Sequence, residues 1–91
     1  MTDTLVPTVV PTERRVVTAI PGPKSVALQE RRRAVVSDGV ASALPVYIER
    51  AHGAILVDVD GNAFLDLGAG IGVTTIGHTD GAVVAAAREQ L

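Results

Sequence analysis

Two short runs of alternating apolar residues, joined by an Asp-Gly pair, constrain the fold of this chain more than any other feature of its sequence. The first run covers residues 55–59, the second covers residues 63–67, and Asp60-Gly61 lies between them. Alternation with a period of two is typical of strands, and Asp-Gly accepts the positive φ angles of a tight turn. The pattern therefore predicts a β-hairpin over residues 55–67. An isolated hairpin is only marginally stable in water, so it needs a sheet or a helix to lie on.

The side chains available to cover that hairpin are small. The 91 residues are 47% hydrophobic, but this fraction is mostly Ala and Val, with one Phe, one Tyr and no Trp or Cys. Large aromatic side chains supply much of the buried area of a core, and without Cys neither disulfides nor thiolate metal sites can compensate. Chains of this size bury a limited fraction of their surface. We therefore expect the apolar surface to pack on residues outside this sequence.

Upstream of the hairpin the sequence predicts one helix, over residues 25–36. It follows the breaker Pro21-Gly22-Pro23 and stops at Ser37-Asp38-Gly39, where Gly tolerates the left-handed conformation that closes a helix. Its apolar side would begin at residues 26–28, and its triplet of arginines would face water.

The two ends of the chain differ in character. Residues 1–20 show no helical or alternating period and are predicted to be a flexible extension. Residues 40–47 are predicted to be a connector.

A second helix is expected over residues 79–91, with Thr79 or Asp80 as its cap and an apolar stripe of Val83, Val84, Ala87 and Leu91. No Gly or Pro stop signal follows, so we expect this helix to be truncated and the chain to be the N-terminal piece of a larger α/β enzyme.

The charge distribution argues against nucleic-acid and membrane partners. Residues 1–33 hold six of the eight Lys and Arg against three acids, whereas residues 34–91 hold two against seven. No aromatic residues are interleaved with the basic ones to stack on bases, so we interpret the basic end as a solvated helix face. No signal peptide and no apolar run of the roughly 20 residues that span a bilayer are visible. We predict a cytoplasmic protein.

A glycine-rich loop over Gly68–His78 is the stretch that suggests a site. Its second half has the glycine spacing of a phosphate-binding P-loop, but His78 stands where that motif needs Lys, and a hairpin precedes it instead of a buried parallel strand. The dinucleotide pattern G-x-G-x-x-G fails as well, because its third Gly would fall on Val73 or on Thr75. Nucleotide binding is therefore not predicted.

Two interpretations of the loop remain open from the residues alone. Glycines let one backbone pass close to another, so the loop and His78 can serve the fold only. Alternatively the loop lines a pocket built mainly by later residues, with Ile71 projecting between Gly70 and Gly72 as part of an apolar wall.

The run GAILVDVDGNAFLDLGAGIGV over residues 53–73, followed by Gly77-His78 and residues 83–86, resembles class III pyridoxal-phosphate aminotransferases. The upstream segments 22–25 and 31–33 are similar to the 4-aminobutyrate aminotransferase branch. The resemblance covers residues 20–91. It implies a fold-type I enzyme, with a large α/β domain, a small α+β domain built from both chain ends, and a homodimeric assembly.

Within that architecture the resemblance divides the chain. Residues 21–78 would be the N-terminal part of the small domain, comprising the helix, the hairpin and the Gly loop. Residues 79–91 would start the helix that leads into the large domain.

The resemblance also implies a reaction. The amino group of 4-aminobutyrate would pass to 2-oxoglutarate, giving succinate semialdehyde and glutamate, with pyridoxal 5'-phosphate as the electron sink. Another class III ω-aminotransferase, acting on ornithine, acetylornithine or 5-aminovalerate, is the alternative within this class. A non-catalytic binding or assembly module is the alternative outside it.

Few functional residues of that family carry over to this chain. Lys24, the one lysine, does not match the cofactor lysine, and no acid matches the partner of the pyridinium nitrogen. We therefore assign no catalytic, cofactor-binding or metal-binding residue here, expect pyridoxal phosphate to be bound outside this chain, and expect the 91 residues alone to be inactive. Ile71 matches an apolar residue at the substrate pocket, with Gly70 and Gly72 beside it. For His78 we expect a structural role.

Overall fold

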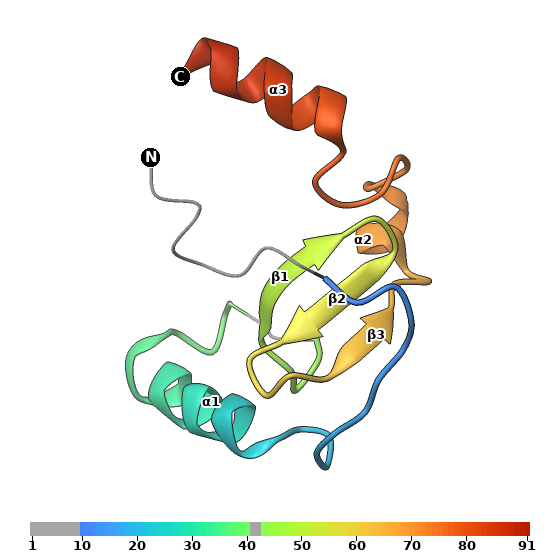
Figure 1. Ribbon diagram of the computed structural model, residues 1–91. Helices are drawn as coiled ribbons and strands as arrows, with labels where there is room; N and C mark the ends of the chain where they lie inside the picture. The colour runs from blue at the N-terminus through green and yellow to red at the C-terminus, as the bar shows by residue number, and fades with distance from the viewer. Residues whose placement is uncertain (1–9, 41–42) are drawn as a thin grey trace.

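The computed structural model describes residues 10–40 and 43–91 and has a three-stranded antiparallel sheet at its centre (Figure 1). The strands lie in the order β1-β2-β3, and two longer helices lie at opposite ends of the view. This is a mixed α/β arrangement, as predicted. The elements are α1 (Pro23–Val35), β1 (Ile48–His52), β2 (Ile55–Asp58), β3 (Ala63–Leu65), α2 (Ala69–Gly72) and α3 (Gly81–Gln90).

The predicted hairpin is confirmed, but its turn differs from the tight Asp-Gly turn expected. β2 pairs with β3 in a register that sets Val57 opposite Ala63. The Gly61 N–H donates to the Asp58 carbonyl at 3.1 Å, and the Asp58 N–H donates to the Asn62 carbonyl at 2.9 Å. In this turn only Gly61 has a positive φ, of 89°. The loop therefore has three residues and a left-handed Gly at its end, which is the next most common hairpin geometry.

The Asp58 carboxylate explains the wider turn. Its Oδ1 accepts from the N–H groups of Asp60 and Asn62, both at 2.9 Å, and its Oδ2 accepts from the Asn62 side-chain amide at 3.0 Å. An Asp side chain that bonds to the backbone two residues on favours such a turn. The turn is therefore organised by a buried side chain as well as by the positive φ of Gly61.

The strand β1 was missed by the sequence analysis, which assigned no element to residues 48–52. It pairs antiparallel with β2, with His52 opposite Ile55, and its register is irregular between Ile48 and Arg50. All of its residues are partly or fully exposed. A strand exposed on both faces needs no apolar alternation, so its sequence carries no period to detect.

The segment before α1 is held along the hairpin. Arg15 and Ala63 exchange backbone hydrogen bonds of 2.9 and 2.6 Å, and the Asn62 Oδ1 accepts from the N–H groups of Val17 and Thr18 at 2.7 and 3.0 Å. These contacts differ from the flexible extension predicted for residues 1–20, of which residues 1–9 lie outside the described part. The sequence pattern did not show them because the bonds use backbone groups and one distant Asn.

The helix α1 confirms the predicted helix, beginning two residues earlier and ending one earlier. The predicted left-handed stop at Gly39 is wrong, because the helix ends at Val35, its C-cap Val36 is extended, and Gly39 has no positive φ.

Pro23 occupies the first turn of α1, where the missing N–H costs nothing. The Asp60 carboxylate accepts from the N–H groups of Lys24 and Ser25 at 2.8 and 3.0 Å. A Cβ on Gly22 would lie 2.4 Å from the Asp60 Cγ, so this approach requires glycine. The hairpin turn thus caps the helix from outside its own sequence.

The face of α1 that is buried is not the predicted apolar one. Ser25 is its one buried residue, whereas Val26 is 43% exposed and Val35 is 83% exposed. The Ser25 Oγ accepts from the Tyr47 N–H at 3.2 Å, and the Tyr47 hydroxyl donates to Gln29 Oε1 at 2.5 Å. The helix therefore meets the sheet through polar contacts at its first two turns, a pairing that apolar periodicity does not reveal.

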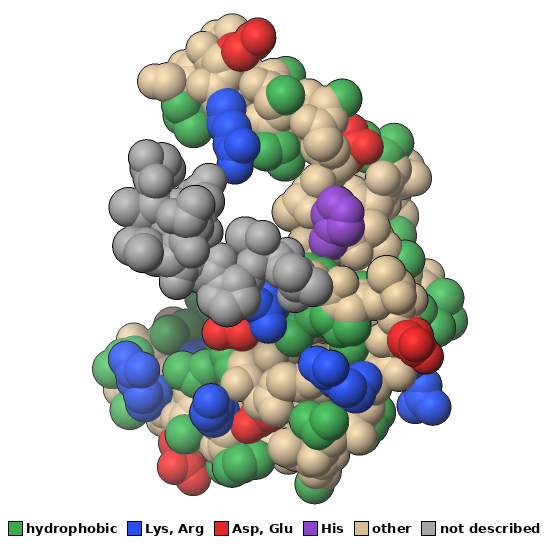
Figure 2. All heavy atoms as spheres, in the orientation of Figure 1, with side chains coloured by type: hydrophobic (Ala, Val, Ile, Leu, Met, Phe, Trp, Pro, Cys, Tyr) green, Lys and Arg blue, Asp and Glu red, His purple; other side chains and the backbone are tan. Residues whose placement is uncertain are grey.

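The core is small and half polar. Among the described residues the buried apolar side chains are Ile55, Val57 and Ala63, and the buried polar ones are Ser25, Asp58 and Asn62. Many larger apolar side chains are exposed, and Figure 2 shows them dispersed over the face viewed, α3 included. The expectation that this surface packs on residues outside the sequence stays a prediction.

The helix α3 begins at the predicted cap. The Asp80 carboxylate accepts from the Val83 N–H at 3.3 Å, but no residue of α3 is buried, and Val83 in its apolar stripe is 53% exposed. Within residues 10–40 and 43–91 no helix has the length and apolar character needed to cross a membrane. The cytoplasmic location stays a prediction.

Replacing Asn62 by Ala should destabilise the protein by about 2–3 kcal/mol, because the Val17 and Thr18 N–H groups and the Asp58 carboxylate lose a partner in a water-poor site. Urea denaturation measures the change. Gln90→Ala, on the exposed end of α3, is the control and should stay within about 0.5 kcal/mol of the wild type. Equal stability of the two variants would contradict the proposed importance of the turn.

Candidate functional site

The Gly68–His78 loop leaves β3, makes a partly left-handed turn at α2 and returns to the end of β1. Gly70, Ile71 and Gly72 have φ angles of 61°, 60° and 80°. The side chain of Ile71 is 98% exposed. The three residues predicted to contact substrate therefore form one turn, with its apolar side chain directed outward from the described residues.

Ile71 is an unusual residue for this conformation. A β-branched side chain at a positive φ is a genuine outlier, and such backbone strain costs about 1–3 kcal/mol. The flanking glycines adopt positive φ without that cost. Strain of this kind persists only where neighbouring contacts hold it, and it gathers at ligand-binding loops.

The Asp66 carboxylate supplies contacts of that kind. Its Oδ1 accepts from the Ala69 N–H at 2.8 Å, and its Oδ2 accepts from His78 Nε2 at 2.6 Å. The hydrogen bond from His78, followed by that from Ala69, lowers the pKa of the Asp66 carboxyl below its ordinary value despite partial burial. One carboxylate thus joins the two ends of the loop.

His78 is itself fixed by its backbone. Its N–H donates to the Gly53 carbonyl at 2.9 Å, and its carbonyl accepts from the Gly53 N–H at 3.0 Å. Gly77 has a φ of 88°, and a Cβ there would lie 3.1 Å from the Gly53 carbonyl oxygen. The Gly77-His78 pair therefore needs its Gly for a close backbone approach, and the structural role expected of His78 stays a prediction.

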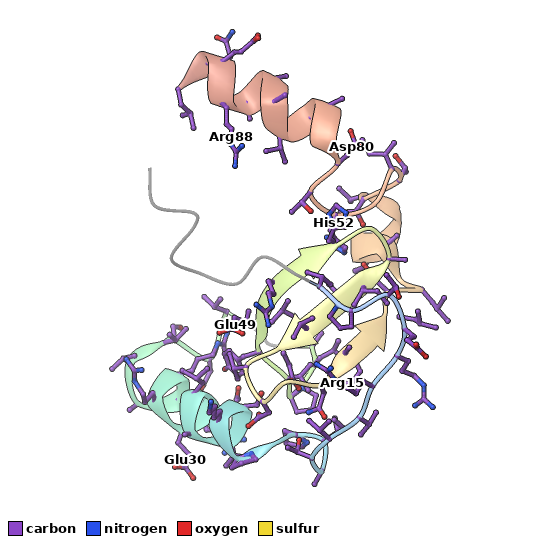
Figure 3. The ribbon with its side chains drawn as sticks, in the orientation of Figure 1. Arg15, Glu30, Glu49, His52, Asp80 and Arg88 are labelled. Atoms are coloured by element: carbon purple, nitrogen blue, oxygen red, sulfur yellow. The ribbon has the colours of Figure 1, made fainter. Side chains whose placement is uncertain are left out.

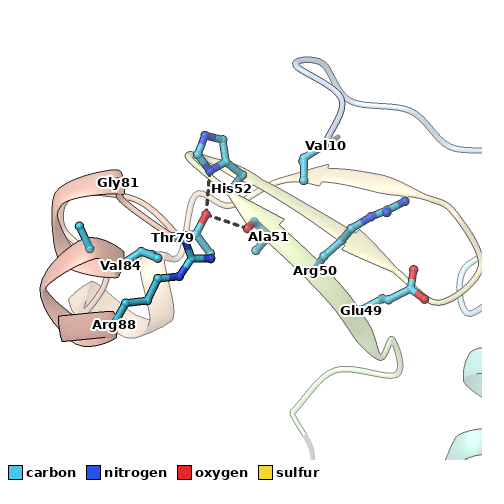
Figure 4. Close-up of a pocket in the computed structure, with 10 residues that line it drawn as sticks. Val10, Glu49, Arg50, Ala51, His52, Thr79, Gly81, Val84 and Arg88 are labelled. Atoms are coloured by element: carbon cyan, nitrogen blue, oxygen red, sulfur yellow. Dashed lines mark hydrogen bonds between the residues drawn. The ribbon is translucent and has the colours of Figure 1, made fainter. Parts of the chain in front are cut away.

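Two hollows border the loop and its neighbours. One, of about 360 Å³, lies inside the loop and is lined by Ala54, Asp66, Thr74, Ile76 and His78 among others. The second, of about 850 Å³, lies between β1 and α3 (Figure 4). Gly70, Ile71 and Gly72 line neither of them. A pocket that includes Ile71 would therefore need further residues to form its other walls.

The larger hollow was not predicted, because one of its walls is the missed strand β1. His52 Nδ1 lies 2.7 Å from the Thr79 Oγ1, and the Thr79 hydroxyl donates to the Ala51 carbonyl at 3.2 Å. Figure 3 shows His52 at the end of β1 nearest the start of α3, and Figure 4 shows Arg88 reaching from α3 toward Thr79. These contacts join β1 to the entry of α3.

The described residues do not fit the demands of a metal or a Schiff-base cofactor. No group of three or more His, Cys, Asp or Glu is clustered in residues 10–40 and 43–91. Lys24 is the one lysine of the sequence, and it lies at the start of α1, at the other end of the sheet from the Gly loop (Figure 1).

Comparison with known proteins identifies the family to which the chain belongs. The sequence model of the family "Aminotransferase class-III" matches residues 36–91, more than half of the chain. The chain belongs to this family, which confirms the resemblance found in the sequence.

Individual relatives give the comparison more detail. The chain is 58% identical over 78 residues to the 4-aminobutyrate aminotransferase of Mycobacterium tuberculosis (strain H37Rv), a match covering 86% of this chain and 17% of the relative. It is 42% identical over 65 residues to the 5-aminovalerate aminotransferase DavT of Pseudomonas aeruginosa, covering 71% and 15%. It is 36% identical over 78 residues to an alanine/serine racemase of Pyrococcus horikoshii, covering 85% and 16%. The chain thus matches less than a fifth of each relative, and these relatives differ in reaction.

Removing the imidazole of His78 should raise the pKa of the Asp66 carboxyl toward its ordinary value of 3.8, because the largest cause of its lowering is lost. A depressed pKa contributes stability that is present above the unfolded value and is lost as the pH falls through the folded value. His78→Ala should therefore show a smaller loss of stability below about pH 4 than the wild type.

The two measurements are carbon-13 NMR titration of the Asp66 carboxyl carbon and acid denaturation. His52→Ala, which removes the other imidazole, should leave the Asp66 titration as it is. An Asp66 pKa unchanged by His78→Ala would contradict the contact.

Proposed function

We propose that this chain is part of a pyridoxal-phosphate-dependent transaminase that moves the amino group of 4-aminobutyrate to 2-oxoglutarate, giving succinate semialdehyde and glutamate. The observation that carries the proposal is the 58% identity to a 4-aminobutyrate aminotransferase over 78 residues. The family membership supports a transaminase, and the name of this relative supports 4-aminobutyrate as the donor.

We also propose the fold-type I architecture for the whole protein. Residues 21–78 would contribute to its small domain, and residues 79–91 would begin the helix leading into the large domain, in a homodimer. The exposed apolar stripe of α3 supports this assignment, since a helix with no buried residue has an apolar side still to cover. The cofactor would be held outside this chain, where it would act as the electron sink of the reaction.

Within this enzyme Ile71 would form part of the wall against which the methylene groups of the amino donor lie. Three features support the proposal: the side chain is almost fully exposed, its backbone is left-handed, and Gly70 and Gly72 add no bulk beside it. A donor with a chain of methylene groups gains affinity from apolar contact, whereas its charged ends need partners of opposite charge. Those partners are not assigned to this chain.

A second candidate function is transamination of 5-aminovalerate, a donor one methylene longer. The observation in its favour is the similarity to two Pseudomonas 5-aminovalerate aminotransferases. A non-catalytic module is disfavoured by membership of an enzyme family.

A panel of amino donors decides between the two candidates. The full-length protein, loaded with pyridoxal phosphate and given 2-oxoglutarate, should produce glutamate with the highest kcat/KM for 4-aminobutyrate. A higher value for 5-aminovalerate would establish the second candidate instead. Absence of glutamate with every ω-amine would refute both.

Replacing Ile71 by Ala in the full-length protein should lower kcat/KM for 4-aminobutyrate about 10-fold, because roughly 1.4 kcal/mol of apolar contact with the donor is lost. Steady-state kinetics measures the change. Val35→Ala removes a similarly exposed apolar side chain from α1 and should leave kcat/KM unchanged. If both variants behave like the wild type, Ile71 does not contact the donor.

A further inference from the structure

We propose that Asp66 and His78 are positioning residues for the amino donor: together they close the Gly loop at its base and thereby hold Ile71 where the donor chain lies. This inference rests on the proposed function, since it concerns the same pocket. It assigns neither residue a contact with substrate. It predicts that kcat/KM for the amino donor depends on two polar side chains at the base of the loop.

The first step is that one carboxylate determines the position of both loop ends. Asp66 follows β3 directly, so its backbone is continuous with the sheet. Its two oxygens bind the Ala69 N–H at the start of the loop and the His78 imidazole at the end. Side-chain exposures of 12% for Asp66 and 22% for His78 show that both partners are partly buried.

The second step is that Ala69 is coupled to Ile71 through a short run of backbone. The Gly72 N–H donates to the Gly68 carbonyl at 3.1 Å, and the Val73 N–H donates to the Ala69 carbonyl at 2.7 Å. Ile71 lies inside this turn. A displacement of Ala69 therefore carries Ile71 with it.

The third step is that Ile71 does not hold its conformation unaided. Its left-handed φ of 60° is disfavoured for a β-branched residue, so the turn relaxes when its supports are removed. The backbone of His78 is fixed, because Gly53, which follows β1, bonds to both its N–H and its carbonyl. Losing the imidazole detaches Asp66 from that support while leaving the sheet bonds in place.

The test compares His78→Ala with His78→Gln in the full-length, cofactor-loaded protein. Gln is the conservative variant because its side-chain amide can donate to Asp66 from near the position of Nε2. His52→Ala is the matched control, since it removes an imidazole whose partner is Thr79. The readouts are kcat and KM for 4-aminobutyrate and 5-aminovalerate, and hydrogen exchange of the peptide covering residues 68–73.

We expect His78→Ala to raise the KM for 4-aminobutyrate more than it lowers kcat, and to change the ratio of kcat/KM between the two donors about 5-fold, less than loss of a whole methylene contact. Exchange over residues 68–73 should become faster. His78→Gln should restore both readouts, and in an Ile71→Ala background His78→Ala should leave the donor ratio unchanged, because the side chain that is positioned is already gone.

Three results would overturn the proposal: a donor ratio and exchange unaffected by His78→Ala, equal effects of His52→Ala, or no restoration by His78→Gln. Each is distinct from failure of the proposed function, in which the wild type transfers no amino group from either donor. In that case the role proposed for Asp66 and His78 in donor selection is rejected as well. An active wild type with an unaffected donor ratio rejects this inference alone.

Discussion

The turn at residues 58–62 holds the hairpin, α1 and the segment before α1 together. Asp58 and Asn62 are fully buried polar residues in a core with only three buried apolar side chains among those described. Buried polar groups are costly unless each finds a partner, and here the partners are the backbone of the turn itself and of the segment at Val17 and Thr18. Asp60 in the same turn caps α1; burial raises its pKa, but the N–H groups of Lys24 and Ser25 outweigh that effect and leave it below its ordinary value. Five residues thus join the hairpin, the first helix and the segment before it.

The Gly loop, at the other end of the hairpin, is also organised by a carboxylate that accepts backbone hydrogen bonds. Asp58 is the last residue of β2, and Asp66 is the first residue after β3. Each carboxylate accepts hydrogen bonds from backbone N–H groups outside the strand pairing. A chain with one Phe, one Tyr and no Trp cannot rely on a large apolar core, so carboxylates satisfied by backbone donors supply much of its organisation. Because the apolar core is small, Ile71 and the apolar side of α3 are not buried. We connect that exposure to function at Ile71 and to domain packing at α3.

Sequence reasoning predicted the elements whose signals are local. The hairpin followed from alternation around Asp60-Gly61, the start of α1 from the breaker Pro21-Gly22-Pro23, and the start of α3 from Asp80. It failed where the determinant is a distant partner: β1 has no apolar period because it is exposed on both faces, and Ser25 is buried because Tyr47, 22 residues away, meets it.

For the site, the glycines around Ile71 indicated an unusual backbone, but the pairing of Asp66 with His78 joins residues 12 apart through a loop whose path no periodicity describes. Family resemblance supplied the class of enzyme, which composition and spacing alone left open.

In the proposed enzyme the strained turn at Ile71 faces the amino donor. A crystal structure of the full-length, cofactor-loaded protein with an unreactive analogue of 4-aminobutyrate would locate this turn relative to the donor. We expect Ile71 at a positive φ, with its side chain within about 4 Å of the methylene carbons of the analogue, and Asp66 still bonded to His78 and to the Ala69 N–H. An analogue bound in the enzyme with Ile71 packed elsewhere, out of contact with it, would show that this turn does not face the donor.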